Sequence, residues 1–178
     1  MESYPPNAAL CREKLPPLGV DFREGDGNDA RYPFEDRSFD LVLNRHGDFN
    51  VEEIRRVLKP GGVFITQQVG AENDRELVEL LLDPVPALPF PGQVLSIVRE
   101  RFEAAGFEVL EAGEAFRTIR FWDVGALVWF ARVIVWEFPG FCVRGCLENL
   151  CRAQAVLERD GVIQGKTHRF LLAARKRN

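Results

Sequence analysis

The sequence predicts an α/β fold, a three-layer sandwich in which helices cover both faces of a mostly parallel sheet. Three observations support this class. Apolar strand patterns alternate with helical patterns, short turns rich in proline and glycine separate them, and the strand candidate "FDLVLN" (39–44) is apolar almost throughout. Such an apolar run indicates burial on both faces, as is typical of a central parallel strand.

The N-terminal region supplies two short elements. A helix begins at Pro5-Pro6 and ends before Pro16-Pro17, because proline fits the first turn of a helix and interrupts a later one. In "VDFRE" (20–24) apolar and charged residues alternate, which predicts a strand.

A helix and another strand follow "FDLVLN". Asn50 and Glu53 form a capping box, so a helix is expected to begin at about Val51. The "KPGG" turn (59–62) ends this helix. The β-branched run "VFITQQV" (63–69) then predicts the next strand.

The middle of the chain begins with a second capping box, Asn73 with Glu76, which predicts another helix. The prolines of 83–92 indicate an irregular loop. Apolar residues at helical spacing predict a helix over 94–105, and Gly106 is its expected left-handed stop.

The last third contains two strands and a pair of helices. "FEVLEA" begins a strand that runs on through "FRTIRF" (107–121), and "HRFLLAAR" closes the chain as a strand. Helices are expected over about 123–137 and 145–159. We interpret 1–178 as a single partial domain and 123–159 as a helical insertion between its last two strands. The aromatic residues of this insertion are expected in its core, and the alternative is that one of them walls a substrate pocket by cation–π attraction: Trp122, Trp129, Phe130 and Trp136.

Composition narrows the classes of function. A net charge of −4 and a pI near 5.3 argue against a general nucleic-acid binder, and the basic ending "RKRN" (175–178) reads as a solvated tail. The cysteines and histidines follow no zinc spacing, so we expect reduced thiols, no metal and a cytoplasmic location. The apolar stretch Val124–Phe138 is shorter than the roughly 20 residues of a membrane span and carries Arg132, so no membrane partner is expected.

Polar residues gather where the predicted parallel strands end. Asp26 follows the first strand, Asn44-Arg45-His46 follows the second, and Gln67-Gln68 lies near the end of the third. Ligands of open parallel sheets bind outside the carboxyl ends of the strands, where helix N-termini also point. We therefore expect a ligand site at this edge.

Two stretches in this region resemble the later motifs of class I S-adenosylmethionine-dependent methyltransferases, of the methyltransferase type 11 kind. They are "YPFEDRSFDLVLNRH" (32–46) and "EEIRRVLKPGGVFITQQVG" (52–70). The resemblance covers about residues 2–112 well and the last strand loosely. It implies a Rossmann-like methyltransferase sandwich with an antiparallel C-terminal strand, and S-adenosylmethionine as cofactor. The acidic charge and the aromatic insertion favour a small molecule over nucleic acid as the methyl acceptor.

The resemblance also implies the residues that bind the cofactor. The acid after the third strand of the family binds the adenine amino group, and the candidates are Asp26 and Asp29. We prefer Asp26, which directly follows its strand and precedes the small residue Gly27. Glu2 corresponds to the acid that binds the ribose hydroxyls, and Asn44 lines the methyl-donor pocket.

Arg45 and His46 are the candidate catalytic residues, because they would orient the methyl acceptor. Methyl transfer from a sulfonium is an in-line displacement that positioning accelerates, so no obligatory base is implied. The alternatives are structural: an ion pair of Arg45 with Asp48 or Glu52, a capped or solvated loop histidine at His46, an Asp26 that only shapes its turn, and Gln67-Gln68 as ordinary strand residues at a wet edge.

One part of the family pattern is missing. The first strand, its glycine-rich turn and the following helix have no counterpart, because "ESYPPN" (2–7) already resembles the end of the second strand. The expectations are a truncated or mis-started version of a longer protein, a short protein that pairs its open sheet edge with a partner or with itself, or an inactive remnant. We accordingly predict a methyltransferase whose 178 residues bind S-adenosylmethionine weakly or not at all. The alternative function is a non-catalytic methyltransferase-like module that acts through self-association or a partner, and a nicotinamide-binding domain is disfavoured by the absent G-x-G-x-x-G.

Overall fold

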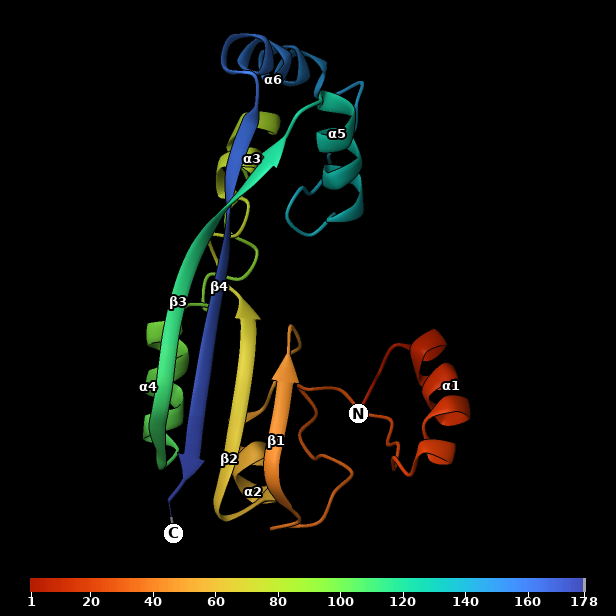
Figure 1. Ribbon diagram of the computed structural model, residues 1–178, viewed down its shortest axis with the longest axis vertical. Helices are drawn as coiled ribbons and strands as arrows, with labels where there is room; N and C mark the ends of the chain where they lie inside the picture. Colours follow the sequence, from red (N-terminus) through yellow and green to blue (C-terminus); the bar gives the residue numbers. More distant parts are fainter. Residues whose placement is uncertain (178) are drawn as a thin grey trace. The chain divides into compact units, whose positions relative to one another are not determined.

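The computed structural model describes residues 1–177 (Figure 1). It contains a short 3₁₀ turn at Pro16–Leu18 and these helices and strands in chain order: α1 (Pro5–Lys14), β1 (Phe39–Arg45), α2 (Val51–Val57), β2 (Leu58–Val69), α3 (Arg75–Leu81), α4 (Leu95–Ala104), β3 (Phe107–Phe121), α5 (Val124–Val133), α6 (Leu147–Asp160) and β4 (Ile163–Lys176).

The strands form one sheet in the order β1-β2-β4-β3. β1 and β2 are parallel, with Leu41 opposite Val63 and Arg45 opposite Gln67. In Figure 1 the arrow of β4 points opposite to those of its neighbours. The predicted class is therefore confirmed: a mixed α/β fold with a mostly parallel sheet and an antiparallel C-terminal strand.

The chain divides into two compact units, which we describe separately. The first unit contains residues 1–68, 99–112 and the C-terminal residues from Leu171 on. The second contains residues 69–98 and 113–170.

Stacked phenylalanine rings form the centre of the first unit. The Phe64 and Phe102 rings are stacked with centroids 5.1 Å apart, and Phe49 and Phe107 pack at angles against Phe102. All four side chains are buried. They come from β2, α4, β3 and the turn before α2, so this cluster joins the segments 1–68 and 99–112 of the unit into one core.

Two features fix the start of α2: the Asn50 cap and a buried ion pair between Glu53 and Arg56. Asn50 caps the helix, and its side-chain oxygen accepts hydrogen bonds from two main-chain N–H groups of the first turn. Glu53 does not reach back to Asn50, as a capping box requires. Its carboxylate instead binds the Arg56 guanidinium at 2.6 Å and accepts the Tyr32 N–H at 2.7 Å. The hydrogen bond from Arg56 lowers the pKa of Glu53, so this buried carboxyl stays ionised and paired.

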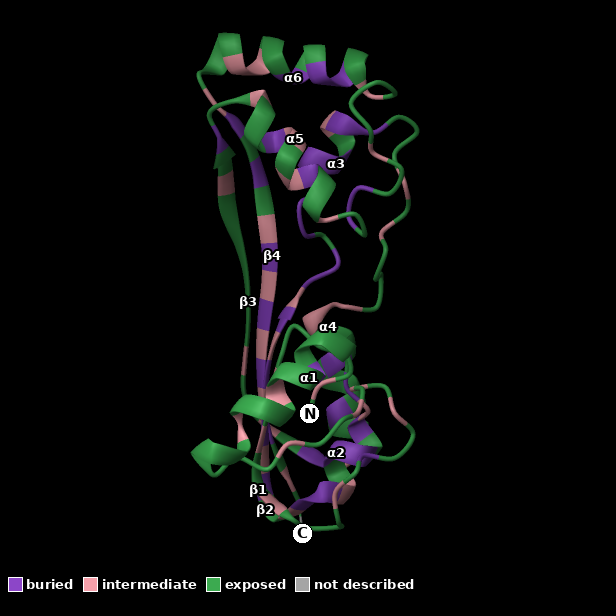
Figure 2. Ribbon diagram, turned by 90° about the vertical axis from the view of Figure 1, so that its right-hand side faces the viewer, coloured by how far each residue is buried: buried purple, intermediate pink, exposed green. Residues whose placement is uncertain are grey.

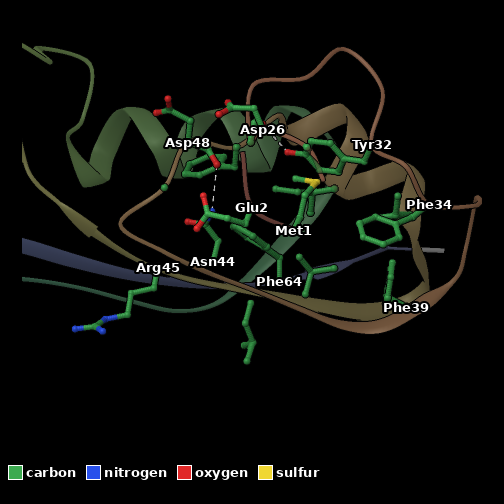
Figure 3. Close-up of a pocket in the computed structure, with 18 of the residues that line it drawn as sticks. Met1, Glu2, Asp26, Tyr32, Phe34, Phe39, Asn44, Arg45, Asp48 and Phe64 are labelled. Atoms are coloured by element: carbon green, nitrogen blue, oxygen red, sulfur yellow. Dashed lines mark hydrogen bonds between the residues drawn. The ribbon is translucent and has the colours of Figure 1, made fainter. Parts of the chain in front are cut away.

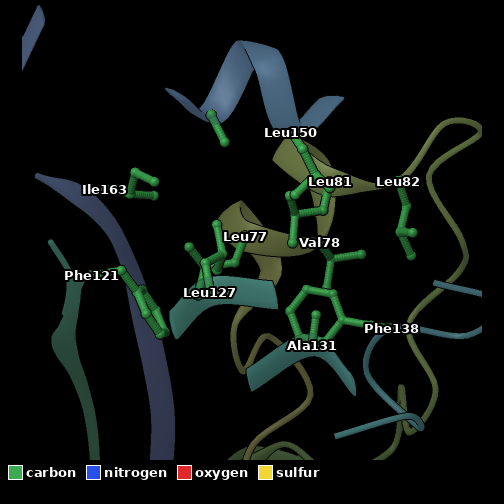
Figure 4. Close-up of a cluster of buried hydrophobic side chains, with 11 residues drawn as sticks. Leu77, Val78, Leu81, Leu82, Phe121, Leu127, Ala131, Phe138, Leu150 and Ile163 are labelled. Atoms are coloured by element: carbon green, nitrogen blue, oxygen red, sulfur yellow. The ribbon is translucent and has the colours of Figure 1, made fainter. Parts of the chain in front are cut away.

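The core of the second unit lies between α3, α5 and α6 (Figure 4). Leu77 and Leu81 of α3 meet Leu127 of α5 and Leu150 of α6, and Phe138 closes the cluster from the turn after α5. Spacing of about one helical turn places Leu77 and Leu81 on the same face of α3.

A buried histidine links β4 to the segment after β2 in this unit. The Nε2 atom of His168 lies 2.8 Å from a Glu114 carboxylate oxygen, and its Nδ1 atom accepts the Glu72 N–H at 3.2 Å. The ring also stacks on Phe116, with centroids 4.3 Å apart. A β-carbon added to Gly70 would lie 2.2 Å from the Nδ1 atom of His168, so the ring occupies space that only glycine leaves open.

Several further sequence expectations about the fold are wrong. The first is the strand at "VDFRE" (20–24): only Glu24 pairs, in an isolated parallel bridge with Glu2, because no neighbouring strand among the described residues extends the ladder. The second is the burial of "FDLVLN" on both faces. Because β1 is the edge strand of the sheet, Leu41 and Leu43 are 49% and 68% exposed.

The third correction concerns two helix ends. The "KPGG" turn (59–62) lies inside β2, which already begins at Leu58. The N-cap of α3 is Asp74, in a left-handed conformation with φ of 57° and with no side-chain hydrogen bond, so Asn73 does not cap this helix. The fourth correction concerns the tryptophans, which were expected in the core: Trp122, Trp129 and Trp136 are 70%, 67% and 55% exposed.

Asn73 instead connects two buried carboxylates. Its amide nitrogen donates to Asp74 at 2.6 Å and to Glu137 at 3.3 Å, and its oxygen accepts the His168 N–H and an Arg169 N–H. The second carboxylate oxygen of Asp74 has no hydrogen-bond partner in the described part of the chain. Burial raises the pKa of Asp74 to about 6 and also raises the pKa of Glu137.

Candidate functional site

A pocket of about 580 Å³ lies in the first unit, against β1 (Figure 3). Its walls are β1 itself, the chain start, the turn around residues 25–27 and the loop after β1. All six residues that the sequence nominated for the site are among those that line it: Glu2, Asp26, Gly27, Asn44, Arg45 and His46. Residues up to 44 positions apart in the sequence thus meet at one cavity.

Asp26 lies in the turn and is held by hydrogen bonds of its side chain and of its main chain. One carboxylate oxygen accepts the Asn28 N–H at 2.9 Å, and the other accepts the Ser3 hydroxyl at 2.8 Å. Its own N–H donates to the Asp29 carboxylate at 2.7 Å. The bond from Asn28 is the main cause that lowers the pKa of Asp26, with the Ser3 bond second, so the group is an anion at neutral pH. Asp29 therefore supports the turn, while Asp26 is the one of the two that lines the pocket.

Glu2 is the second anion of the pocket. One carboxylate oxygen accepts the Tyr4 N–H at 2.8 Å, and the other accepts the Asn7 amide at 3.3 Å. The Tyr4 N–H is the main cause that lowers the pKa of Glu2. Its main chain is fixed by the parallel bridge to Glu24. Each carboxylate oxygen of Glu2 and Asp26 retains acceptor capacity, because a carboxylate offers about four lone-pair positions.

The turn at Gly27 is fixed against the loop after β1. The Tyr32 hydroxyl donates to the Gly27 carbonyl oxygen at 2.7 Å and accepts the Asn50 N–H at 2.8 Å. Burial raises the pKa of Tyr32, so the phenol keeps the proton that it donates. The Asn28 amide donates to the Asp48 carboxylate at 2.6 Å. Tyr32 and Asn28 therefore bind the turn to the loop from two sides.

The Asn44 side chain lies on the face of β1 that lines the pocket. Its amide group forms hydrogen bonds with neighbouring residues. Its oxygen accepts from the Gln68 amide at 2.6 Å and from the Thr66 hydroxyl at 3.0 Å, and its nitrogen donates to the Asp48 carbonyl at 3.2 Å. Gln68 is buried and also donates to the Gly47 carbonyl at 3.0 Å. Asn44 thus shapes the wall of the pocket and orders the loop after β1.

Arg45 and His46 contribute to the pocket in different ways. Successive side chains of a strand point to opposite faces, and Figure 3 shows the Arg45 side chain directed away from the cavity. Its Nε donates to the Gln67 side chain at 3.2 Å, and neither Asp48 nor Glu52 pairs with it among residues 1–177. His46 has a left-handed main chain with φ of 55°, and its N–H donates to the Gln67 carbonyl at 3.0 Å.

Sequence reasoning missed several residues that line the pocket. Met1, Tyr32 and Phe64 supply apolar surface, and Asp48 supplies a third carboxylate at the rim. The polar cluster "RHGDF" (45–49) could have indicated Asp48, since it continues the polar run after the strand. Tyr32 had no signal of its own, because its role depends on contacts with Gly27 and Asn50.

A second cavity of about 430 Å³ lies in the second unit. It is lined by Phe116 and by charged side chains that partly pair with one another, such as Lys166 with Glu76 at 3.1 Å. None of the nominated site residues lines it.

Over residues 1–177 no cluster of three or more histidine, cysteine, aspartate or glutamate side chains is arranged to hold a metal ion. No helix in that range is long and apolar enough to cross a membrane.

The N-terminal part of the chain is similar in sequence to known methyltransferases. The family model described as "Methyltransferase domain" matches residues 1–66. A Mycobacterium ulcerans protein named "Probable phthiotriol/phenolphthiotriol dimycocerosates methyltransferase 2" is 43% identical over 71 residues, which are 36% of this chain and 27% of that protein. A Mycolicibacterium smegmatis protein named "Fatty-acid O-methyltransferase" is 39% identical over 63 residues, 32% of this chain and 22% of that protein. The matched part is about a quarter of the length of these relatives.

Comparison with solved structures covers nearly the whole chain. A "putative methyltransferase" from Bacillus halodurans aligns with 99% of this chain and 81% of its own, with a TM-score of 0.62 and 20% sequence identity. The chain therefore shares the Rossmann-like fold of this structure. Residues 1–66 match the methyltransferase domain family, which confirms for this part of the chain the resemblance seen in the sequence.

Proposed function

We propose that this chain is the cofactor-binding part of a methyltransferase that transfers a methyl group from S-adenosylmethionine to a small, apolar acceptor. One observation carries the proposal. Two ionised carboxylates, Glu2 and Asp26, line the same pocket at the end of β1 and keep free lone pairs. The match of residues 1–66 to the methyltransferase domain supports this use of the pocket.

The donor and acceptor set fits the adenosine part of the cofactor. Glu2 would accept hydrogen bonds from the ribose hydroxyls, and Asp26 would accept one from the adenine amino group. Gly27 presents only main chain to the pocket, and Phe64 and Met1 supply apolar surface for a ring. When bound, the cofactor supplies an activated methyl group on sulfur.

The acceptor would approach from the loop after β1. His46 and Arg45 are the proposed positioning residues, with His46 favoured because the Arg45 side chain points away from the cavity. The named relatives include a fatty-acid O-methyltransferase and a dimycocerosates methyltransferase, which supports an apolar small molecule as the acceptor. The acidic net charge of −4 fits this class better than nucleic acid.

Ligand-observed NMR tests the pocket even when binding is weak, as we predict for these 178 residues. S-adenosylmethionine should show saturation transfer from the protein to its adenine and ribose protons. Asp26→Asn should weaken binding about tenfold or more, because it removes a charge-assisted acceptor. Asp21→Asn is the matched control, since Asp21 is exposed and lies outside the pocket. Equal signals from both variants would reject the assignment of the pocket.

A second candidate function rests on the edge of the sheet. Leu41 and Leu43 are exposed on β1, whose outer side pairs with no other strand in residues 1–177. An exposed apolar edge strand readily adds a strand from another chain. The alternative is therefore a methyltransferase-like module that acts through self-association or a partner at β1.

A further inference from the structure

α5 and the turn that follows it expose an apolar stripe. Trp129 and Val133 are 67% and 51% exposed and lie four residues apart, which places them on one side of the helix. Val135 and Trp136 continue the stripe into the turn and are 60% and 55% exposed. We call these four residues the α5 stripe.

The stripe is separate from the face of α5 that packs in the core. Leu127 and Ala131 are fully buried and face α3 and α6 in the hydrophobic cluster, together with Phe138 (Figure 4). α5 is thus apolar on two sides, although only one side is covered (Figure 2). An exposed apolar patch beside polar residues often marks an interaction site, so the exposed side of α5 indicates a binding surface.

Inside the segment from Val124 to Leu147 the exposed charges are both positive, and the exposed acids Asp123 and Glu148 flank it at the N-cap of α5 and in the first turn of α6. Between Val124 and Leu147 the sequence has two arginines, Arg132 and Arg144, and a single acid, Glu137. Both arginines are exposed, whereas Glu137 is 6% exposed and binds Asn73 inside the unit. Neither arginine forms an ion pair within residues 1–177. The exposed surface of this segment is therefore apolar, aromatic and cationic, without an accessible carboxylate.

We propose that the α5 stripe and its two arginines bind the surface of an anionic lipid bilayer. Tryptophan is suited to the membrane–water interface because its ring is apolar and its indole N–H is polar. Arginine can keep its guanidinium among phosphate headgroups while its stem lies along apolar surface. The helix would lie in the plane of the interface, as amphipathic surface helices do.

A second copy of the chain fits this surface less well. A two-fold interface puts the same patch against itself, so the two arginines would face their own copies, and the acids that could pair with them, Asp123 and Glu148, lie outside the stripe at the starts of α5 and α6. This inference departs from the expectation of no membrane partner, which considered only whether Val124–Phe138 is long enough to span a bilayer. It does not depend on the proposed methyltransferase activity.

Vesicle binding tests the proposal with the full chain and without cofactor. The three tryptophans of the protein all lie between residues 122 and 136, so their fluorescence reports directly on this surface. Vesicles of phosphatidylcholine with phosphatidylglycerol should shift the emission to the blue, and brominated lipid should quench it. Vesicles of phosphatidylcholine alone should bind several times more weakly, and salt should weaken the binding to anionic vesicles.

Point variants separate the apolar and the cationic contributions in co-sedimentation with anionic vesicles. Trp129→Ser should weaken binding about tenfold, and the control Leu18→Ser, at a 75% exposed leucine outside the second unit, should not. Arg132→Gln should weaken binding about fivefold, and the control Lys14→Gln should not. Circular dichroism confirms that each variant is folded.

Three results would overturn the proposal. One is an unshifted tryptophan emission with anionic vesicles. Another is equal binding by Trp129→Ser and Leu18→Ser. The third is concentration-dependent self-association that disappears in Trp129→Ser while vesicles have no effect, which would assign the stripe to a second copy of the chain.

Discussion

The main chain of Gly27 lies directly against the carbonyl group of Asp48. A β-carbon added to Gly27 would be 1.8 Å from the Asp48 carbonyl oxygen, far inside any contact distance. The same carbonyl accepts the Asn44 amide at 3.2 Å. The turn that carries Asp26 and the loop that follows β1 are therefore fitted to each other through main-chain atoms, and the pocket depends on this fit.

Gly27→Ala should destabilise the first unit. The new methyl group meets main chain, which cannot rotate away as a flexible side chain can, so the turn must move as a whole. We expect the free energy of unfolding to fall by about 1–3 kcal/mol in chemical denaturation. Gly47→Ala is the matched control in the same pocket, because its added carbon would meet only the Asn44 side-chain nitrogen at 3.5 Å. Similar losses in both variants would contradict the role of this contact.

Tyr32→Phe should loosen the same turn from the other side. The substitution leaves the partly buried Gly27 carbonyl and Asn50 N–H without the hydroxyl that joins them. A hydrogen bond contributes about 0.5–1.5 kcal/mol net, so the loss of both bonds should lower the denaturant midpoint measurably. Tyr4→Phe, at a tyrosine that is 60% exposed, should leave the midpoint unchanged. A neutral Tyr32→Phe would show that the hydroxyl does not hold the turn.

The stability of the protein should decrease as pH rises through the range in which Asp74 ionises. Its pKa is about 6 when folded, against an ordinary value of 3.8, because burial disfavours the charged carboxylate. Between these values the folded state keeps a proton that the unfolded chain has released. The free energy of unfolding therefore falls from about pH 4 to pH 6 by on the order of 2 kcal/mol and then levels off.

Asp74→Asn should reduce this pH dependence, since the amide does not ionise. Glu137 contributes a smaller change of the same sign, because burial raises its pKa as well. Urea denaturation at several pH values measures the effect, with Asp21→Asn as an exposed control. A pH profile that Asp74→Asn leaves unchanged would show that Asp74 is not the titrating group.

Leu43→Lys should suppress association through the sheet edge. Leu43 is the most exposed apolar residue of β1, and a lysine at an edge strand opposes pairing with another strand. We expect sedimentation velocity to show concentration-dependent association of the wild-type chain that is reduced in Leu43→Lys. Leu18→Lys, which adds the same charge outside the sheet, should associate like the wild type. If Leu43→Lys has no effect, β1 is not the association surface.

Elements with strong local signals could be predicted from the sequence. Asn50 marks the start of α2 because its side chain satisfies N–H groups of the first turn, whatever the rest of the fold does. Gly106 ends α4 with φ of 82°, a conformation that other residues rarely adopt. Pro5 begins α1 for a similar local reason.

The predictions that failed depended on distant partners. "VDFRE" (20–24) has a strand pattern, but a strand also needs a neighbour, and the bridge to Glu2 is all that this segment has. Asn73 has the spacing of a helix cap, but Asp74, Glu137 and β4 offer its amide stronger bonds. The apolar run in β1 indicates a strand correctly, yet only the order of the sheet decides whether its faces are covered.

The sequence predicts at which edge of the sheet the pocket lies, but it does not predict the hydrogen bonds that its side chains form. Parallel strands place their ends at one edge, so Asp26 and Asn44 were expected together, and both line the pocket. The alternation of side chains along β1 already implies that Asn44 and Arg45 face opposite ways. Nothing local shows that Gln68 binds the Asn44 oxygen, because that bond depends on how β1 and β2 are aligned.

The close contact between Gly70 and His168 limits how this protein can change during evolution. The ring of His168 and a side chain at position 70 would occupy the same volume, so the two positions can vary only together. A chain that loses the glycine must first, or at the same time, replace the histidine by a small residue, and Glu114 and Phe116 then lose the ring that they contact. Two positions almost a hundred residues apart should consequently covary among related sequences, with any residue other than glycine at 70 accompanied by a small side chain at 168.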